Sequence, residues 1–249
     1  QWSKIKDRKG ANDTQKSILY GTASRDIIVA ARSGGSPDPN LNAQLAAVLK
    51  KYKDQGIPRE NIDKALNKAG AGKEKAGESV TYEALAFGSV GIVVECLTDN
   101  ATRTLHNIRH ALTRNEARMT PVKFMFQRKG CVKVSLDKSL ADHEKQVEDL
   151  IEAALAADAE DFDQRDDEEN PKTLVLKFVC PPEALSVVTL ALVSSSTPSL
   201  KLQSSELIYA PAEEAEEPSE ELGSKMAALV EELQADEDTL RVWTSLDSW

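Results

Sequence analysis

The chain has 249 residues, of which 41% are hydrophobic and 29% are charged, the ordinary composition of a soluble globular protein. With 12 Gly and 10 Pro it is neither collagen-like nor disordered in bulk, and no apolar run approaches the roughly 18–20 residues of a membrane span. The net charge of −10 is unevenly divided, since residues 1–75 carry +7, residues 76–135 carry +3 and residues 136–249 carry −20. A uniformly acidic chain would argue against a nucleic-acid partner, whereas this chain has a cationic first half.

The start of the chain has the pattern of a basic helical domain. Apolar residues recur at helical spacing from Lys16 to Arg32 and again from Leu41 to Lys53, and Pro58 begins a third helix. Residues 69–77, rich in Gly, Ala and Lys, then have the composition of a flexible linker. We therefore predict a first domain over residues 1–76.

Beyond the linker the pattern changes to short strands alternating with helices. Residues 80–87 and 91–97 are β-rich runs that predict a hairpin, and a helix is expected over residues 101–115. From residue 131 the expected order is strand, helix, strand, strand, helix, strand, which is typical of a ferredoxin-like domain.

The last predicted helix and strand are too small to fold alone, so we expect them to return to the sheet that begins after the linker. The predicted fold class is therefore α+β, with an N-terminal helical bundle and two α/β sandwich domains, the third inserted into the second. The predicted domains are residues 1–76 (basic, helical), residues 77–130 with 212–249 (discontinuous α/β), and residues 131–211 (acidic, ferredoxin-like).

Three cysteines, Cys96, Cys131 and Cys180, lie far apart in the sequence, within or beside apolar runs. An odd number at wide spacing matches neither a disulfide framework nor a zinc motif, so we expect buried reduced thiols and a reducing compartment. Because the chain begins at Gln1 rather than Met, we also expect that an upstream segment has been removed.

The candidate catalytic and metal motifs are all incomplete. His106 and His110 have the spacing of zinc-binding histidines, but Asn107 stands where a metalloprotease has Glu, which favours a solvated helix face. Residues 71–73 lack the other positions of a phosphate-binding loop, and the acidic run 158–169 lacks the Gly of a calcium loop and is expected to be solvated. We therefore expect no enzymatic activity, no metal and no cofactor.

The basic side chains of the first domain remain as candidates for function. Lys and Arg neutralise phosphates and release counterions, and the scarcity of aromatic residues among them favours recognition of RNA backbone or shape over base stacking. The alternative interpretation is a solvated, Lys-rich helix surface. The predicted nucleic-acid-binding residues of this domain are Lys4, Lys6, Arg8, Lys9, Lys16, Arg25, Arg32, Lys50, Lys51 and Lys53.

Several motifs resemble those of the YebC/PmpR family, in one order across the first 130 residues. The similar segments are residues 2–13 (WSKIKDRKGAND, like SKW-x-NIKHRK), 26–35 (DIIVAARSGG, like EI-x-x-AAR-x-GG), 57–62 (IPRENI, like MPK-x-NI), 94–104 (VECLTDNATRT, like ECLTDN-x-x-RT) and 126–130 (FQRKG, like F-x-RKG). One departure is Asp7, which stands at the His of HRK and indicates a divergent, organellar member.

The resemblance implies three domains, with the third inserted into the second, and no enzymatic activity. Bacterial members have been described as DNA-binding transcriptional regulators. Related members act in translation and associate with the ribosome, among them the mitochondrial translational activator of cytochrome c oxidase subunit one.

We expect a mitochondrial translational activator that binds ribosomal or messenger RNA and supports the synthesis of organelle-encoded proteins. The acidic third domain would repel nucleic acid and face solvent or a basic ribosomal protein. The expected location is the mitochondrial matrix, with the cytoplasm as the alternative, and the expected state is a monomer. Residues of the second domain that extend the predicted RNA surface are Arg103, Arg109, Arg128 and Lys129.

Two other functions stay open. A DNA-binding transcriptional regulator would need side chains that read base edges, ideally from a symmetric dimer. A protein-interaction adaptor would use its basic end to meet acidic partners.

Overall fold

The computed structural model describes residues 2–70, 77–167, 170–195, 197, 199–213 and 218–246, and the side chains of residues 2–15 and 18 lie outside this description. The predicted α+β class is confirmed: an N-terminal helical region is followed by two four-stranded antiparallel sheets. None of the described helices is long and apolar enough to cross a membrane.

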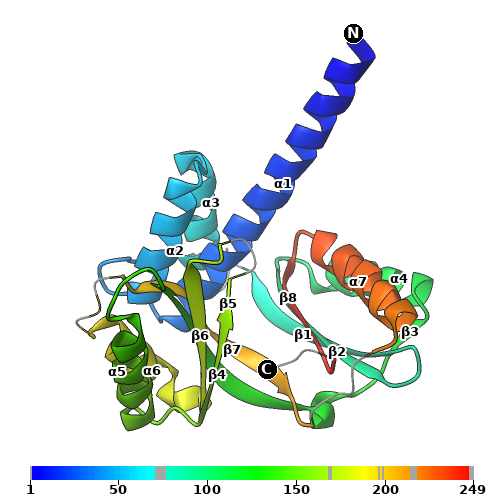
Figure 1. The fold of residues 1–249 in the computed structure, drawn as a ribbon. Helices are drawn as coiled ribbons and strands as arrows, with labels where there is room; N and C mark the ends of the chain where they lie inside the picture. Colours follow the sequence, from blue (N-terminus) through cyan, green and yellow to red (C-terminus); the bar gives the residue numbers. More distant parts are fainter. Residues whose placement is uncertain are drawn as a thin grey trace.

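The N-terminal region contains three helices, α1 (Trp2–Ser33), α2 (Ala43–Asp54) and α3 (Arg59–Gly70). The helical backbone of α1 begins at Trp2, well before the predicted start at Lys16, and Figure 1 shows it projecting beyond α2 and α3 as an arm. The C-terminal half of α1 packs against α2 and α3 around a buried core. Most of the predicted linker, residues 71–76, lies outside the described residues.

The connection from α1 to α2 depends on the buried side chain of Asn42. Its Oδ1 accepts a hydrogen bond from the backbone N–H of Leu45 (3.0 Å), which caps α2, while its Nδ2 donates to the carbonyl oxygen of Ala30 (2.9 Å). Any side chain at Gly34 would collide with this amide, so the chain needs glycine where α1 ends. One polar side chain thus satisfies groups at the ends of two helices.

The first sheet has the strand order β3-β1-β2-β8, and its strands pair antiparallel. The strands β1 and β2 form the predicted hairpin, whereas β3 was not predicted because three residues show no alternation. The bounds are β1 Glu78–Ala86, β2 Val90–Thr98, β3 Ala117–Met119 and β8 Thr239–Thr244, with helices α4 Ala101–Arg114 and α7 Glu220–Ala235. Because β8 pairs with β2, the C-terminal elements lie in the sheet that begins after the linker.

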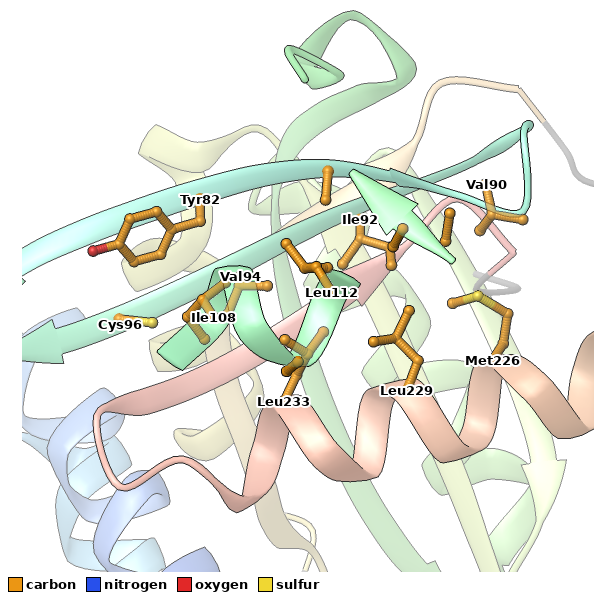
Figure 2. Close-up of a cluster of buried hydrophobic side chains, with 14 residues drawn as sticks. Tyr82, Val90, Ile92, Val94, Cys96, Ile108, Leu112, Met226, Leu229 and Leu233 are labelled. Atoms are coloured by element: carbon orange, nitrogen blue, oxygen red, sulfur yellow. The ribbon is translucent and has the colours of Figure 1, made fainter. Parts of the chain in front are cut away.

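Helices α4 and α7 cover one face of the first sheet, and Figure 2 shows the core between them. Ile92 and Val94 of β2 meet Ile108 and Leu112 of α4, and Leu229 of α7 closes the cluster. All five side chains are at most 1% exposed, so α7 is held by apolar burial to elements more than 100 residues earlier in the chain.

The second sheet has the order β5-β6-β4-β7, and the predicted βαββαβ succession is observed. Its helices α5 and α6 share one buried core with β4 and β6. The elements are β4 Phe126–Asp137, α5 His143–Ala156, β5 Asp161–Asp166, β6 Thr173–Cys180, α6 Leu185–Val193 and β7 Lys201–Pro211, with short 3-10 turns at Lys123–Met125 and Pro182–Ala184. The predicted boundary between residues 130 and 131 lies inside β4, because that strand pairs with β7 without interruption from Phe126 to Lys133.

The three cysteines are free and buried, as predicted. Burial raises the pKa of the Cys96 thiol to about 12 and the pKa values of Cys131 and Cys180 to about 11. Within the acidic run, residues 161–166 form the edge strand β5, the short strand that the predicted βαββαβ succession includes, while residues 168 and 169 lie outside the described residues.

Candidate nucleic-acid interface

The helical region and the two sheets meet around Arg241 of β8. The guanidinium donates from Nη2 to Asp26 Oδ1 on α1 (2.8 Å) and from Nε to Glu206 Oε2 on β7 (2.9 Å). Burial would lower the pKa of Arg241, but the carboxylates of Glu206 and Asp26 outweigh this effect and raise it. Asp26 also accepts a short hydrogen bond from the hydroxyl of Tyr52 on α2. These four side chains join the three parts of the molecule through one charged cluster.

A second contact seats α2 on the second sheet. Gln44 Nε2 donates to Ser205 Oγ on β7 at 2.8 Å, and that hydroxyl also bonds Thr189 Oγ1 on α6 at 2.7 Å. Gln44 and Ser205 are both buried. The face of α2 next to Gln44 is thereby held opposite β7 and the end of α6.

Between α2 and β7 lies a cleft of about 760 Å³. Lys50 and Lys51 of α2 line one side and Lys201 of β7 lines the other, while Asp54 is the only carboxylate among the described residues that line it. Lys51 also lines a smaller adjoining cavity of about 210 Å³ together with Lys133 of β4. Amines from two parts of the chain therefore surround one space, which suits a polyanion.

The described lining of the cleft has no aromatic side chain, and its remaining walls are mainly small, polar or aliphatic. In the helical region Tyr52 is 2% exposed and Tyr20 is partly buried against the helical core. The side chain of Trp2 lies outside the described residues. Base stacking thus has no platform in the described cleft, whereas backbone contacts do.

Four of the predicted residues present exposed amines on the helices. Lys16, Lys50, Lys51 and Lys53 are all exposed. Lys51 is the most constrained, because its Nζ lies 4.0 Å from Asp26 Oδ2 and 5.0 Å from the centre of the Tyr52 ring. The side chains of Lys4, Lys6, Arg8 and Lys9 lie outside the described residues, and their backbone belongs to the arm of α1.

The guanidinium groups of Arg25 and Arg32 contact the protein itself. Arg25 Nη1 donates to the carbonyl oxygen of Gln234 at the end of α7 (3.1 Å), and Arg32 donates to Ser79 Oγ on β1. Burial lowers the pKa of both side chains. Both arginines tie α1 to the first-sheet domain through these bonds, and phosphate binding by them stays a prediction.

The predicted residues of the second domain do not line the cleft. Arg103 pairs with Asp99 and Asp238 (both 2.9 Å), which ties α4 to the turn before β8. Arg109 is exposed. Arg128 lies 2.9 Å from Glu95 and 4.1 Å over the centre of the Tyr209 ring, and Lys129 lies 2.6 Å from Glu160. The structure thus does not bring them together with the lysines of α2.

Sequence reasoning missed Lys133 and Lys201. The charge sum of −20 for residues 136–249 concealed that Lys201 faces the helices. The alternation of side chains along β4 could have identified Lys133. Val132 and Val134 point into the domain core, so Lys133 points to the opposite face of the sheet.

The fold and the cleft define a three-part α+β protein in which a basic helical region is fixed against two sheets. The chain belongs to the TACO1/YebC family. Residues 1–72 match the family model described as the TACO1/YebC protein N-terminal domain, and residues 77–246 match the model described as the TACO1/YebC second and third domain.

Curated relatives span the whole chain. A protein of Enterococcus faecalis is 33% identical over 252 residues, which cover 100% of this chain and 98% of that protein, and a protein of Thermobifida fusca is 34% identical over 254 residues, covering 99% and 94%. Both are named probable transcriptional regulatory proteins. The crystal structure of a conserved hypothetical protein from Aquifex aeolicus is similar with a TM-score of 0.68 at 28% identity, covering 94% of this chain and 90% of that one.

Proposed function

We propose that this protein is a translation factor that binds ribosomal or messenger RNA through the phosphate backbone, in the cleft between α2 and β7. The observation that carries the proposal is the position of Lys50 and Lys51 opposite Lys201, around a space without described aromatic side chains. Such a site neutralises phosphates and reads no base by stacking. Exposed Lys16 and Lys53 extend the basic surface along the helices.

The same geometry favours an RNA strand or loop over duplex DNA. A helix that reads DNA enters the major groove, which is about 12 Å wide, with its contacting face free. In this structure the lysine face of α2 lies opposite β7 across the cleft, so α2 does not present that face freely to a major groove.

A DNA-binding transcriptional regulator is the second candidate, and the names of the bacterial relatives favour it. The two candidates use the same cationic surface but differ in the polyanion preferred.

The rest of the proposal concerns the setting of this activity. The protein acts as a monomer in the mitochondrial matrix, with the cytoplasm as the alternative, and supports the synthesis of organelle-encoded proteins on the ribosome. It needs no cofactor and catalyses no reaction. The acidic helix α5 of the second-sheet domain does not line the cleft, and it faces solvent or a basic ribosomal protein.

Titration of the purified protein against a labelled single-stranded RNA and a labelled DNA duplex, at several salt concentrations, tests the proposal. Replacing Lys50 and Lys201 with Ala should weaken RNA binding and reduce the slope of log K against log salt by about 0.7 for each lysine removed. Lys145→Ala on α5, an exposed lysine on an acidic helix, is the matched control. Tighter binding to the duplex than to RNA, or an unchanged slope in the cleft variant, would contradict the proposal.

A further inference from the structure

The surface helix α6 exposes an apolar stripe. Val187 and Leu190 are 56% and 57% exposed and lie along one side of the helix, and Val193, 41% exposed, continues this row to the edge of the cleft between α2 and β7. Leu185, Val188 and Leu192 form the opposite, buried side, which packs in the core of the second-sheet domain. The buried side of α6 therefore supplies the apolar contacts to the core, and the exposed stripe lies outside that core.

The surroundings of the stripe are unusual for a solvated helix. No Lys, Arg, Asp or Glu occurs from Leu185 to Leu200, although the outer face of a surface helix is normally polar or charged. On the neighbouring helix α5, Leu155 is another large apolar side chain, 50% exposed. Large apolar side chains exposed in a row along a surface helix mark an interaction site.

The charge around this surface selects the class of partner. Helix α5 packs beside α6 and carries four exposed carboxylates, Glu144, Glu148, Asp149 and Glu152, against the single exposed Lys145. This acidic rim repels RNA and anionic lipid. It also opposes a twofold contact between two copies through this face, since such a contact would place like charges opposite each other.

We infer that the α5–α6 face, defined by the apolar stripe of α6 and the carboxylates of α5, is a docking surface for a basic amphipathic helix of another protein. The apolar side of that helix covers Val187 and Leu190, and its Lys or Arg side chains meet Glu148 and Glu152. The pairing follows the helix-in-groove mode, in which apolar anchors supply affinity and charges set the orientation. The inference deepens the proposed function, because it assigns a surface to the protein partner of the acidic domain.

The test uses the full chain and a synthetic peptide of Leu and Lys arranged as an amphipathic helix. One control peptide has the same composition in scrambled order, and a second has Glu in place of Lys. The double variant Val187→Ser with Leu190→Ser removes the stripe, and Phe124→Ser, a large apolar residue 80% exposed outside α6, is its matched control. A third variant, Glu148→Gln with Glu152→Gln, removes the charge. The substituted side chains of α5 and α6 are exposed. Circular dichroism and thermal unfolding check that each variant is folded.

We expect the Kd for the Leu/Lys peptide to rise about ten-fold or more in the stripe variant and to stay unchanged in the Phe124 control. The charge variant should bind with a weaker dependence on salt, and neither control peptide should bind. Equal binding of the scrambled peptide, an unchanged Kd in the stripe variant, or a wild-type dimer that the stripe variant converts to monomer would overturn the inference.

RNA titrations on the same variants separate this inference from the proposed function. The stripe variant should bind RNA like the wild type, and the Lys50 and Lys201 variant should bind the peptide like the wild type. If the wild-type protein binds the peptide but not RNA, only the proposed function fails, and if it binds RNA but not the peptide, only the docking inference fails.

Discussion

Replacing Arg241 with Met tests how the three parts of the molecule are held together. Arg241 bonds Asp26 at 2.8 Å and Glu206 at 2.9 Å, and the three side chains are 21%, 22% and 15% exposed. Removing the guanidinium takes from Glu206 the one cation it pairs with among the described residues, and leaves Asp26 with Lys51 at 4.0 Å and the hydroxyl of Tyr52. Breaking a buried ion pair in this way costs about 3–5 kcal/mol, and the partial exposure here places the expected loss near the lower value.

The loss should appear in both stability and domain contact. For a chain of this size a loss of about 3 kcal/mol lowers Tm by roughly 6–12 °C, which scanning calorimetry measures directly. Because Arg241 joins α1 to β7, limited proteolysis should also release the helical region from the sheets earlier than in the wild type.

Two further variants separate the physical causes. If the penalty comes from uncompensated carboxylates, then adding Asp26→Asn and Glu206→Gln to Arg241→Met should restore most of the lost stability. Arg165→Met, which breaks an exposed pair with Asp163, should cost less than about 1 kcal/mol. A loss below about 1 kcal/mol in Arg241→Met, or a triple variant no more stable than the single one, would contradict a penalty from uncompensated carboxylates.

Three other predictions concern buried groups. Burial would raise the pKa of Asp238, but hydrogen bonds from Arg103 and two threonines lower it. The ionised carboxylate therefore stabilises the folded state above about pH 4, and this stability is lost as pH falls through the folded pKa, so the midpoint of urea unfolding should depend less on pH over that range in Asp238→Asn. The three buried cysteines, with raised pKa values, should react with iodoacetamide at pH 8 only after unfolding in urea, and labelling of the native protein would contradict their burial. A Cβ at Gly130 would lie 2.7 Å from Cys180 Sγ and 3.0 Å from Leu185 Cβ, so Gly130→Ala should lower stability by about 1–3 kcal/mol in denaturant titration, whereas Gly223→Ala, with open space around it, should not.

The sequence predicted the elements of the fold well where apolar periodicity is strong. Helix α4 and the paired strands β1 and β2 begin and end within a few residues of their predicted limits. Weak periodicity explains the misses: β3 is three residues long, and the first half of α1 lacks an apolar face that would have announced a helix before Lys16.

The candidate site was only partly predictable, because charge along the chain does not say which cations meet in space. The lysines of α2 were named correctly as exposed, but Arg25 and Arg32 lie on the side of α1 that packs against the sheets, and no local pattern shows that packing. Lys201 joins the cleft through long-range contacts such as that of Gln44 with Ser205, residues 161 positions apart. Long-range placement of this kind is a property of tertiary structure.

The most direct test of the central claim is co-sedimentation of the protein with mitochondrial ribosomes at physiological salt, with excess duplex DNA as competitor. We expect the wild-type protein to pellet with ribosomes despite the DNA, and the Lys50→Ala, Lys201→Ala variant to pellet much less. Release of the wild-type protein by duplex DNA, or no pelleting at all, would contradict a translation role and favour transcriptional regulation.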